Sequence, residues 1–337
     1  MTKKRILVTG ASGFIGSFIV EKGITLGYEV WAGMRTGSSR RYLKDENIKF
    51  IELNLGNEDT LNEQIKHHKA KHGAWDYIIH AAGATKCLDK KEFMMVNFEG
   101  TKNLIKALKN NEATPLKFIY LSSLSIFGPV REEEPHTSIL DSDQAIPNTA
   151  YGHSKLMAEA YIRNSNIPYI ILRPTGVYGP REHDYYKMAV SIKKHIDFAV
   201  GYKKQTITFI YVKDLVKAIY LSVEKDVANR CYFVSEPRGY SSRSFSDYIQ
   251  KSMGVKNVLH ITAPIWVLKI ISSIAEAVAN FTQKASTLNS DKYNIMKQRN
   301  WLCDTTPIEQ ELGFTTDYNL EQGTEETIQW YKQEKWL

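Results

Sequence analysis

The sequence predicts an α/β protein in which a doubly wound parallel sheet carries a smaller, mostly C-terminal α/β lobe. Three observations predict it. Short β-branched runs alternate with helical periodicity through the first half, a glycine-rich turn joins the first run to the first helix, and the alternation fades after Arg173-Pro174. The 337 residues suffice for about two domains. We expect one domain over residues 1–172, with 206–235 folding back onto it, and a second lobe made of 173–205 and 236–337.

The expected strands are short apolar runs bounded by turn residues. They are Arg5–Thr9, Glu29–Met34, Ile48–Glu52, Tyr77–His80, Lys117–Ser122 and Tyr169–Leu172. Apolar residues at three- and four-residue steps predict helices between them, over Phe14–Leu26, Thr60–Ala70, Asn97–Asn110 and Ser154–Asn164. Further along we expect a strand pair, Thr206–Val212 with Cys231–Val234, and helices at Ser244–Met253, Ile265–Phe281 and Leu320–Gln333.

The charge of the chain excludes little by itself. The formal net charge is +7, and the basic residues are scattered rather than interleaved with aromatic residues. We therefore predict no nucleic-acid partner. The opening MTKKRILVTG runs directly into glycine-rich sequence, which is not the pattern of a signal peptide.

Cysteine and histidine spacing gives no metal centre. Cys87, Cys231 and Cys303 lie far apart, which supports neither a zinc site nor a disulfide framework. His68 and His72 have an i,i+4 spacing, but no third ligand is apparent and a solvated helix face is expected there. The sequence predicts no metal and favours a reduced, cytoplasmic protein.

One apolar stretch, Ile265–Phe281, calls for a test as a membrane span. Lys269 and Glu276 interrupt it, and it is shorter than the roughly 20 apolar residues that a span needs. Its large residues instead define one face of a helix: Trp266, Ile270, Ile274, Ala277, Val278 and Phe281. We expect that face to pack in the core or at a dimer contact, with the lining of an apolar substrate pocket as the alternative.

The glycine-rich turn after the first strand predicts a phosphate-binding loop. It reads Thr9-Gly10-Ala11-Ser12-Gly13-Phe14-Ile15-Gly16 and leads directly into a helix. Gly10 permits the tight turn, Gly13 lets backbone N–H groups approach a pyrophosphate, and Gly16 permits close packing of helix on strand. Ser12, Phe14 and Ile15 belong to the same predicted contact. The strand–turn–helix context predicts an NAD(P)-binding Rossmann domain over residues 1–172.

The end of the second strand bears on the choice of dinucleotide. Folds of this kind place there an acidic residue for the ribose 2′-hydroxyl, or an arginine for a 2′-phosphate. This strand ends in Arg35, with Ser38 and Arg40 behind it and no carboxylate. The sequence therefore favours NADP(H), with NAD(H) possible if Arg35 is a surface residue stacked on the adenine.

Tyr151 and Lys155 predict acid/base chemistry. Four residues apart on a helix, they share one face. Tyrosine is a poor base at neutral pH, and a nearby ammonium stabilises the phenolate and lowers its pKa. Ser123, at the end of an earlier strand, is expected to hydrogen-bond the reacting oxygen. The neighbouring Ser122 and Ser125 are equally well explained as strand-end and turn caps.

These motifs together resemble one family, the extended short-chain dehydrogenases/reductases, also named the NAD-dependent epimerase/dehydratase family. The resemblance covers nearly the whole chain. It rests on TGASGFIG at 9–16, HAAG at 80–83, VNFEGT at 96–101, YLSSLSIFG at 120–128, YGHSK at 151–155, LRPTGVYGP at 172–180, FIYVKDL at 209–215 and the ending at 312–331.

The resemblance implies roles for individual residues. Ser123, Tyr151 and Lys155 would be catalytic, and Tyr151 and Lys155 would also contact the cofactor. The other implied cofactor contacts are Asn54 and Leu55 beside the adenine, Ala81, Ala82, Gly83 and Asn97 along the dinucleotide, and Pro174 with Thr175 over the nicotinamide. It also implies a homodimer through the helices near residues 97–110 and 154–164.

Two positions separate this chain from the family's sugar-nucleotide enzymes. Gly176 stands where those enzymes usually present an Asn, and Ile207 stands where they usually carry an Arg for the diphosphate. This segment is more similar to that of the dihydroflavonol-reductase and 3β-hydroxysteroid-dehydrogenase branch; it reads Arg173-Pro174-Thr175-Gly176-Val177-Tyr178-Gly179. An anion site built from other basic residues stays open, namely Lys86, Arg181, Arg238, Arg243 and Lys203-Lys204.

The resulting hypothesis is hydride transfer between NAD(P)(H) and a carbonyl or secondary alcohol of a largely apolar small-molecule substrate. The first alternative is a nucleotide-sugar epimerase or dehydratase that keeps and recycles bound NAD. The second is a non-catalytic dinucleotide sensor on the same scaffold.

Overall fold

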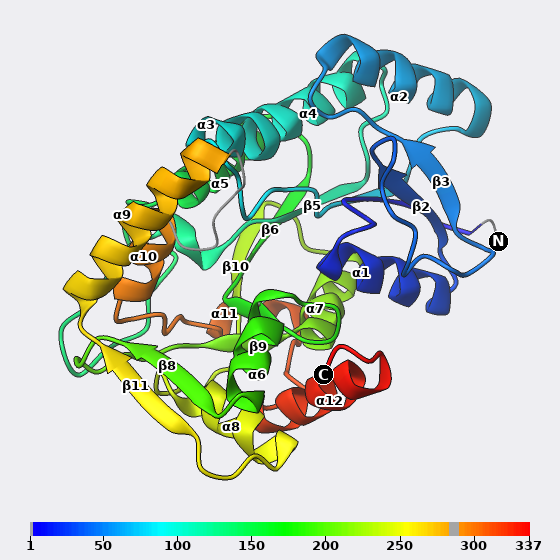
Figure 1. Cartoon of the computed structure of the whole chain (residues 1–337). Coiled ribbons are helices and arrows are strands. Elements are labelled where there is room, and N and C mark those ends of the chain that lie inside the picture. Colours follow the sequence, from blue (N-terminus) through cyan, green and yellow to red (C-terminus); the bar gives the residue numbers. More distant parts are fainter. Residues whose placement is uncertain (1–2, 283–289) are drawn as a thin grey trace.

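The computed structural model describes residues 3–282 and 290–337, without the side chains of 277–282. Within these residues, seven parallel strands form one sheet in the order β10-β6-β5-β4-β1-β2-β3 (Figure 1). The strands are β1 (Arg5–Thr9), β2 (Glu29–Met34), β3 (Lys49–Glu52), β4 (Tyr77–His80), β5 (Lys117–Leu121), β6 (Tyr169–Pro174) and β10 (Arg230–Val234). The strand order reverses between β1 and β4, which is where this kind of sheet binds ligands. The predicted Rossmann fold is confirmed.

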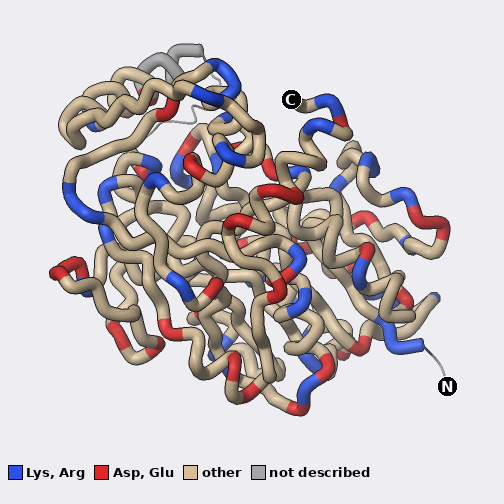
Figure 2. The backbone as a smooth tube through the Cα atoms, turned by 90° about the horizontal axis from the view of Figure 1, so that it is seen from below, with Lys and Arg blue, Asp and Glu red and all other residues tan. Residues whose placement is uncertain are grey.

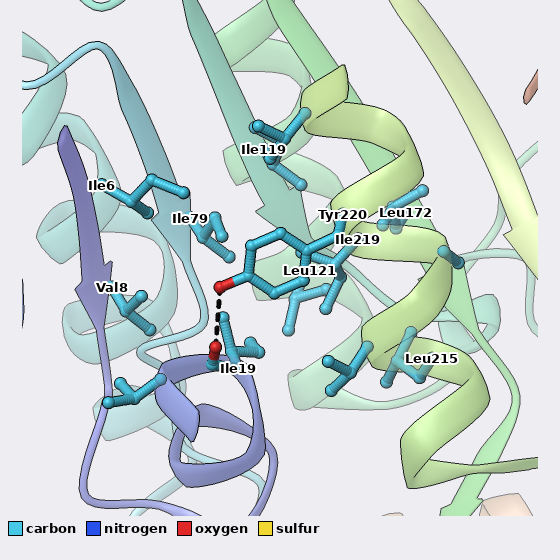
Figure 3. Packing of buried hydrophobic residues seen from close by; sticks show 14 of the residues in the cluster. Ile6, Val8, Ile19, Ile79, Ile119, Leu121, Leu172, Leu215, Ile219 and Tyr220 are labelled. Carbon is cyan, nitrogen blue, oxygen red and sulfur yellow. Dashed lines mark hydrogen bonds between the residues drawn. The ribbon is translucent and has the colours of Figure 1, made fainter. Parts of the chain in front are cut away.

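Helices cover both faces of this sheet. One face carries α1 (Phe14–Thr25), α7 (Val212–Glu224) and α11 (Thr306–Leu312), and the other carries α2 (Glu58–His72), α4 (Gly100–Asn110) and α5 (Ala150–Arg163). Ile6 and Val8 of β1 face the first layer while Leu7 faces the second, and all three are fully buried. Figure 3 shows the first layer, where Tyr220 of α7 donates a 2.7 Å hydrogen bond to the carbonyl of Ile19 on α1.

The remaining elements surround the sheet and build the second lobe. Near the sheet lie α3 (Lys90–Phe93), a π-helix η1 (Met94–Glu99) and a 3-10 turn η2 (Leu124–Ile126). The lobe contains two parallel strand pairs, β7 (Gly176–Tyr178) with β9 (Phe209–Tyr211) and β8 (Ile196–Val200) with β11 (Leu259–Ala263). Its helices are α6 (Asp184–Lys193), α8 (Ser244–Met253), α9 (Ile265–Thr282), α10 (Ser290–Lys297) and α12 (Leu320–Gln333). Figure 1 shows β8, β11, α6, α8 and α12 gathered at one end of the molecule.

The strand pair predicted from residues 206–212 and 231–234 is wrong as a pair. Strand β9 pairs with β7, whereas β10 joins the main sheet beside β6. The cause is α7, which lies between them in the sequence and packs on the main sheet as a crossover helix. After α7 the chain continues into the main sheet as β10, whereas β9 stays paired with β7.

The structure also corrects two predictions about side-chain surroundings. Trp266, Ile270 and Ile274 of α9 are exposed, so this face packs neither in the core nor around a pocket. The side chains of Ala277, Val278 and Phe281 lie outside the described residues. His68 is buried rather than solvated, because its ring stacks on Trp75 at 3.9 Å. Among the described helices, none is long and apolar enough to cross a membrane.

Candidate active site

The glycine-rich turn forms a tight loop between β1 and α1. Gly10 has φ +68°, and a Cβ there would lie 2.7 Å from the Ala82 Cα. A Cβ on Gly16 would overlap the carbonyl oxygen of Gly10. Helix α1 starts after Gly13 with no capping side chain and no acidic residue in its first turn, so its first N–H groups and positive dipole end suit an anion. Ser12, Gly13, Phe14 and Ile15 are all at least partly exposed. These features fit a dinucleotide pyrophosphate.

Behind this loop lies a buried histidine whose role the sequence motif HAAG does not reveal. His80 at the end of β4 hydrogen-bonds through Nδ1 to Thr9 Oγ1 at 2.6 Å and through Nε2 to Thr101 Oγ1 at 2.9 Å. Thr9 Oγ1 also accepts from the Ala82 N–H at 3.2 Å. Burial lowers the pKa of His80 to about 3. The neutral imidazole thus ties the glycine-rich loop to the loop that starts at Ala81.

The predicted adenine end of the site is open to solvent. Arg35 is exposed at the end of β2, and in the described residues no salt bridge holds it. Arg40, by contrast, stacks on Phe50 at 4.0 Å. A carboxylate does reach this turn from β3, where Glu52 accepts a hydrogen bond from Thr36. Asn54 and Leu55 follow directly after β3, and the Asn54 N–H donates to Gln64 at 2.9 Å.

Helix α5 begins at the predicted acid/base residue. Thr149 caps it by accepting from the Gly152 N–H at 3.0 Å. Asp291 of α10 accepts from the Ala150 N–H at 2.8 Å and from the Tyr151 N–H at 3.4 Å. Because 140 residues separate Asp291 from Tyr151, sequence spacing gives no signal for this contact. The negative charge at a helix N-terminus stabilises the start of α5.

Lys155 lies one turn further along α5 and is buried. Its ammonium donates to the carbonyl of Leu121 at 2.8 Å and lies 4.8 Å above the ring of Tyr120. Burial lowers the pKa of Lys155 to about 8, and the charge of Glu159 opposes that change. A Cβ on Gly83 would come within 3.2 Å of this ammonium, so the loop after β4 and Lys155 meet at one place.

Tyr151 and Ser123 interact through their side chains. Burial raises the pKa of Tyr151, and hydrogen bonding with Ser123 opposes the increase. The Lys155 ammonium donates to the Leu121 carbonyl, and its predicted effect on the pKa of Tyr151 stays a prediction. Ser123 Oγ also donates to Ser125 Oγ at 3.1 Å and accepts from the Ser125 N–H. Ser122 is buried, and its hydroxyl makes no hydrogen bond among the described residues.

Asn97 lies in the π-helix η1 and is fully buried. Its amide oxygen accepts from the Ala84 N–H at 2.7 Å, and its amide nitrogen donates to Ser154 Oγ at 2.9 Å and to the Ala84 carbonyl at 3.0 Å. Asn97 thereby joins Ala84, in the loop after β4, to Ser154 of α5. Its predicted contact with a cofactor stays a prediction.

A cavity of about 310 Å³ adjoins Ser123, one of the predicted catalytic residues. Ser123 and Ser125 form its wall together with Pro174 and Thr175, whereas Tyr151 and Lys155 are not part of that wall. The rest of its lining is mostly apolar and includes Met188, Phe198, Val200, Ile207, Phe209, Ile295, Met296 and Trp301. None of the described residues that line the cavity is charged.

The basic residues that the sequence offers for an alternative anion site do not line this cavity. Lys86 pairs with Asp184, Arg181 with Glu21, and Arg243 with Asp247. Arg238 lies over the ring of Tyr240, and Lys203-Lys204 are exposed. Figure 2 shows basic and acidic residues interspersed over the chain. Among the residues that the structure describes, this arrangement supplies no cluster of cations for a diphosphate beside the cavity.

Known proteins with similar sequences include enzymes of several activities. The chain is 23% identical to a sterol-4-alpha-carboxylate 3-dehydrogenase (decarboxylating) of Dictyostelium discoideum, over 96% of this chain and 99% of that protein. It is 24% identical to a UDP-N-acetyl-alpha-D-glucosaminuronate decarboxylase of Bacillus cytotoxicus, over 98% of each. The crystal structure of UDP-glucuronic acid 4-epimerase from Bacillus cereus in complex with NAD is similar with a TM-score of 0.75 and 20% identity, over 98% of this chain and 99% of that one.

One family model matches most of the chain. The model described as the NAD dependent epimerase/dehydratase family matches residues 6–234, which include the glycine-rich loop, Ser123, Tyr151 and Lys155. The resemblance drawn from the motifs is confirmed, and the observed strand order agrees with it. The chain belongs to the NAD-dependent epimerase/dehydratase family, the extended short-chain dehydrogenases/reductases.

Proposed function

We propose that this protein transfers hydride between NADP(H) and a carbonyl or secondary alcohol of a largely apolar substrate. The observation that carries the proposal is the uncharged cavity beside Ser123. A nucleoside diphosphate buried there would find none of the cationic partners that it needs among the described lining residues. A Cβ on Gly176 would lie 2.8 Å from Tyr185 Oη and 3.2 Å from the ring of Phe209, so aromatic rings fill the space beside this residue. The sterol dehydrogenase among the relatives supports the same branch.

Each catalytic residue then has a defined task. Because burial raises the pKa of Tyr151, the phenol stays protonated at neutral pH and donates its proton to the substrate oxygen in the direction of reduction. Ser123 in the cavity wall orients that oxygen. Lys155 places a cationic group between the loop of Gly83 and α5. A bound dinucleotide supplies or accepts the hydride.

The preference for NADP(H) rests on Arg35. Its guanidinium is exposed at the end of β2 and offers charge-assisted hydrogen bonds to a 2′-phosphate. Glu52, which reaches the same turn through Thr36, is the group that would favour NAD(H) instead.

The test of the proposed function is Tyr151→Phe. A panel of apolar ketones with NADPH, followed by absorbance of the nicotinamide, gives turnover, and calorimetric titration gives cofactor affinity. Removal of the acid should reduce turnover by roughly 10²–10⁴-fold and leave cofactor affinity unchanged. Tyr161→Phe on the same helix is the matched control and should behave as the parent. Equal turnover of the Tyr151 variant and the parent would refute the assignment.

The names of other relatives favour a second candidate, an epimerase or dehydratase that recycles bound NAD. Such an enzyme need not release its cofactor, whereas a reductase exchanges it at every turnover. Purification without added cofactor, followed by denaturation and mass analysis, separates the two. Stoichiometric NAD supports the recycling enzyme, and an empty site or NADP that washes away supports the reductase.

We further propose that the protein is a homodimer through the faces of α4 and α5. Met95 and Val96 of η1 and Met157 of α5 are exposed there, which supports a contact between copies. The three free cysteines support a reducing, cytoplasmic location.

A further inference from the structure

The described part of helix α9 turns most of its large apolar side chains toward solvent. Its exposed side carries Trp266, Ile270 and Ile274, which are 65%, 51% and 59% exposed, while Leu268 and Ser272 are buried beneath. A surface helix of a globular protein normally turns its apolar side to the core. Here Trp266, Ile270 and Ile274 face outward, whereas Leu268 packs inward.

The neighbouring strand pair extends this apolar surface. In the parallel register of β8 and β11, Phe198 lies opposite Ile261, and Leu259 lies two residues earlier on the same face. Phe198 and Leu259 are each 62% exposed, and Tyr202 after β8 is exposed as well. Strand β11 leads directly into α9, and Figure 1 shows β8, β11 and α9 along one margin of the molecule.

We call these side chains the apolar margin. Its members are Phe198, Tyr202, Leu259, Ile261, Trp266, Ile270, Ile271 and Ile274. More than half of the exposed large apolar side chains in the described residues belong to it. Contiguous exposed apolar surface of this kind marks an interaction site.

Lysines outnumber acidic residues around the apolar margin. Glu276 of α9, which follows the margin, pairs with Lys90 at 3.5 Å and accepts from the Ser290 N–H at 3.1 Å. Residues 193–204 and 256–274 contain six exposed lysines: Lys193, Lys194, Lys203, Lys204, Lys256 and Lys269. Among the described residues, no carboxylate forms a salt bridge with any of their ammonium groups. The single acid of these segments, Asp197, is buried and hydrogen-bonded to Ser246 and His260. The margin therefore suits an apolar partner that carries negative charge.

The apolar margin also adjoins the cavity of the catalytic site. Phe198 belongs to both, and Ala199 and Val200 continue from it into the cavity wall. Ile295 and Met296 of α10 form another part of that wall, and α9 packs on α10. An apolar molecule at the margin thus lies beside the wall of the cavity.

We propose that the apolar margin docks this protein on an anionic lipid bilayer, from which an apolar substrate reaches the cavity. Tryptophan and aliphatic residues inserted at the boundary of headgroups and acyl chains, with lysines at the edge, are the features of helices that lie on membranes. A second copy on this margin would bring identical rows of lysines together, which opposes that pairing. The route of the substrate rests on the proposed function, whereas the docking does not.

The test is flotation of the purified full chain with vesicles of phosphatidylcholine, with and without phosphatidylglycerol. The parent should float with the anionic vesicles, less with neutral ones, and less at high salt. Trp266→Glu/Ile270→Glu should lower the bound fraction by more than about tenfold. Leu116→Glu, which changes an equally exposed apolar residue outside the margin, should float as the parent does.

Three outcomes would overturn the proposal. They are no flotation of the parent, equal flotation of the parent and the double variant, and a dimer that the double variant converts to monomer in gel filtration. The last would make the margin a subunit interface. Tyr151→Phe should float as the parent does, and Trp266→Glu/Ile270→Glu should keep its turnover of short, water-soluble ketones. A failure of the docking proposal is therefore seen in flotation, and a failure of the proposed function is seen in turnover.

Discussion

A buried ion pair connects the catalytic helix to the strand beside the cavity, and its removal gives a sharp prediction. Arg173 of β6 and Glu159 of α5 have side chains only 3% and 2% exposed. The guanidinium donates from its ε nitrogen at 3.1 Å and from a terminal nitrogen at 2.8 Å, in a two-point contact. Arg173→Met leaves the Glu159 carboxylate buried with Arg163, which is 3.5 Å away and 44% exposed, as its remaining basic partner among the described residues.

We expect Arg173→Met to reduce the free energy of unfolding by about 3–5 kcal/mol, because an unpaired buried charge costs that much. The double variant Arg173→Met/Glu159→Leu should recover most of this loss, since both charges are then absent. Urea unfolding followed by tryptophan fluorescence measures both. A double variant as unstable as the sum of the two single variants would refute the reasoning.

The same pair of variants has a catalytic readout. Glu159 raises the pKa of Lys155 against the lowering effect of burial, which brings it to about 8. Loss of Glu159 should therefore move the alkaline fall of kcat/KM to lower pH.

Two further predictions concern His80 and Arg35. The pKa of His80 falls from 6.5 to about 3 on folding. Between these two pH values the unfolded chain therefore binds a proton at His80 that the folded chain does not bind. The free energy of unfolding consequently decreases as the pH falls from 6.5 toward 3. His80→Gln should remove up to about 1.4 kcal/mol per pH unit from that slope in urea unfolding at several pH values, and an unchanged slope would contradict the buried neutral imidazole. Arg35→Ala should weaken NADPH binding by roughly 10- to 100-fold and spare NADH, with Arg40→Ala as the control held on Phe50. An equal loss of affinity for NADPH and NADH would contradict a contact between Arg35 and the 2′-phosphate.

The sequence predicts the parallel sheet closely because its strands are buried on both faces. Continuous apolar runs such as Ile6 to Val8 occur where helices cover both sides, so strand and helix alternate visibly in the sequence. The glycine-rich loop is equally predictable from the sequence, because Gly10 and Gly16 have no room for a side chain.

Contacts between distant segments are what the sequence does not predict. Asp291 at the start of α5 and the Thr9–His80–Thr101 contact depend on which loops meet in space. Periodicity indicates that a helix has an apolar face but not what covers it, which is why the expectation that this face of α9 packs in the core is wrong. For the same reason His68, placed between lysines in sequence, turns inward onto Trp75.

The carboxylate of Asp291 bears on how this enzyme can be divided. The stretch that the family model matches, residues 6–234, contains the strands of the main sheet and the three predicted catalytic side chains. The first backbone N–H groups of α5 nevertheless donate to Asp291, which lies outside that stretch. A chimera that exchanges the C-terminal third for another specificity must therefore also carry an acceptor at this position. The start of the helix that carries Tyr151 and Lys155 thus depends on a side chain of α10.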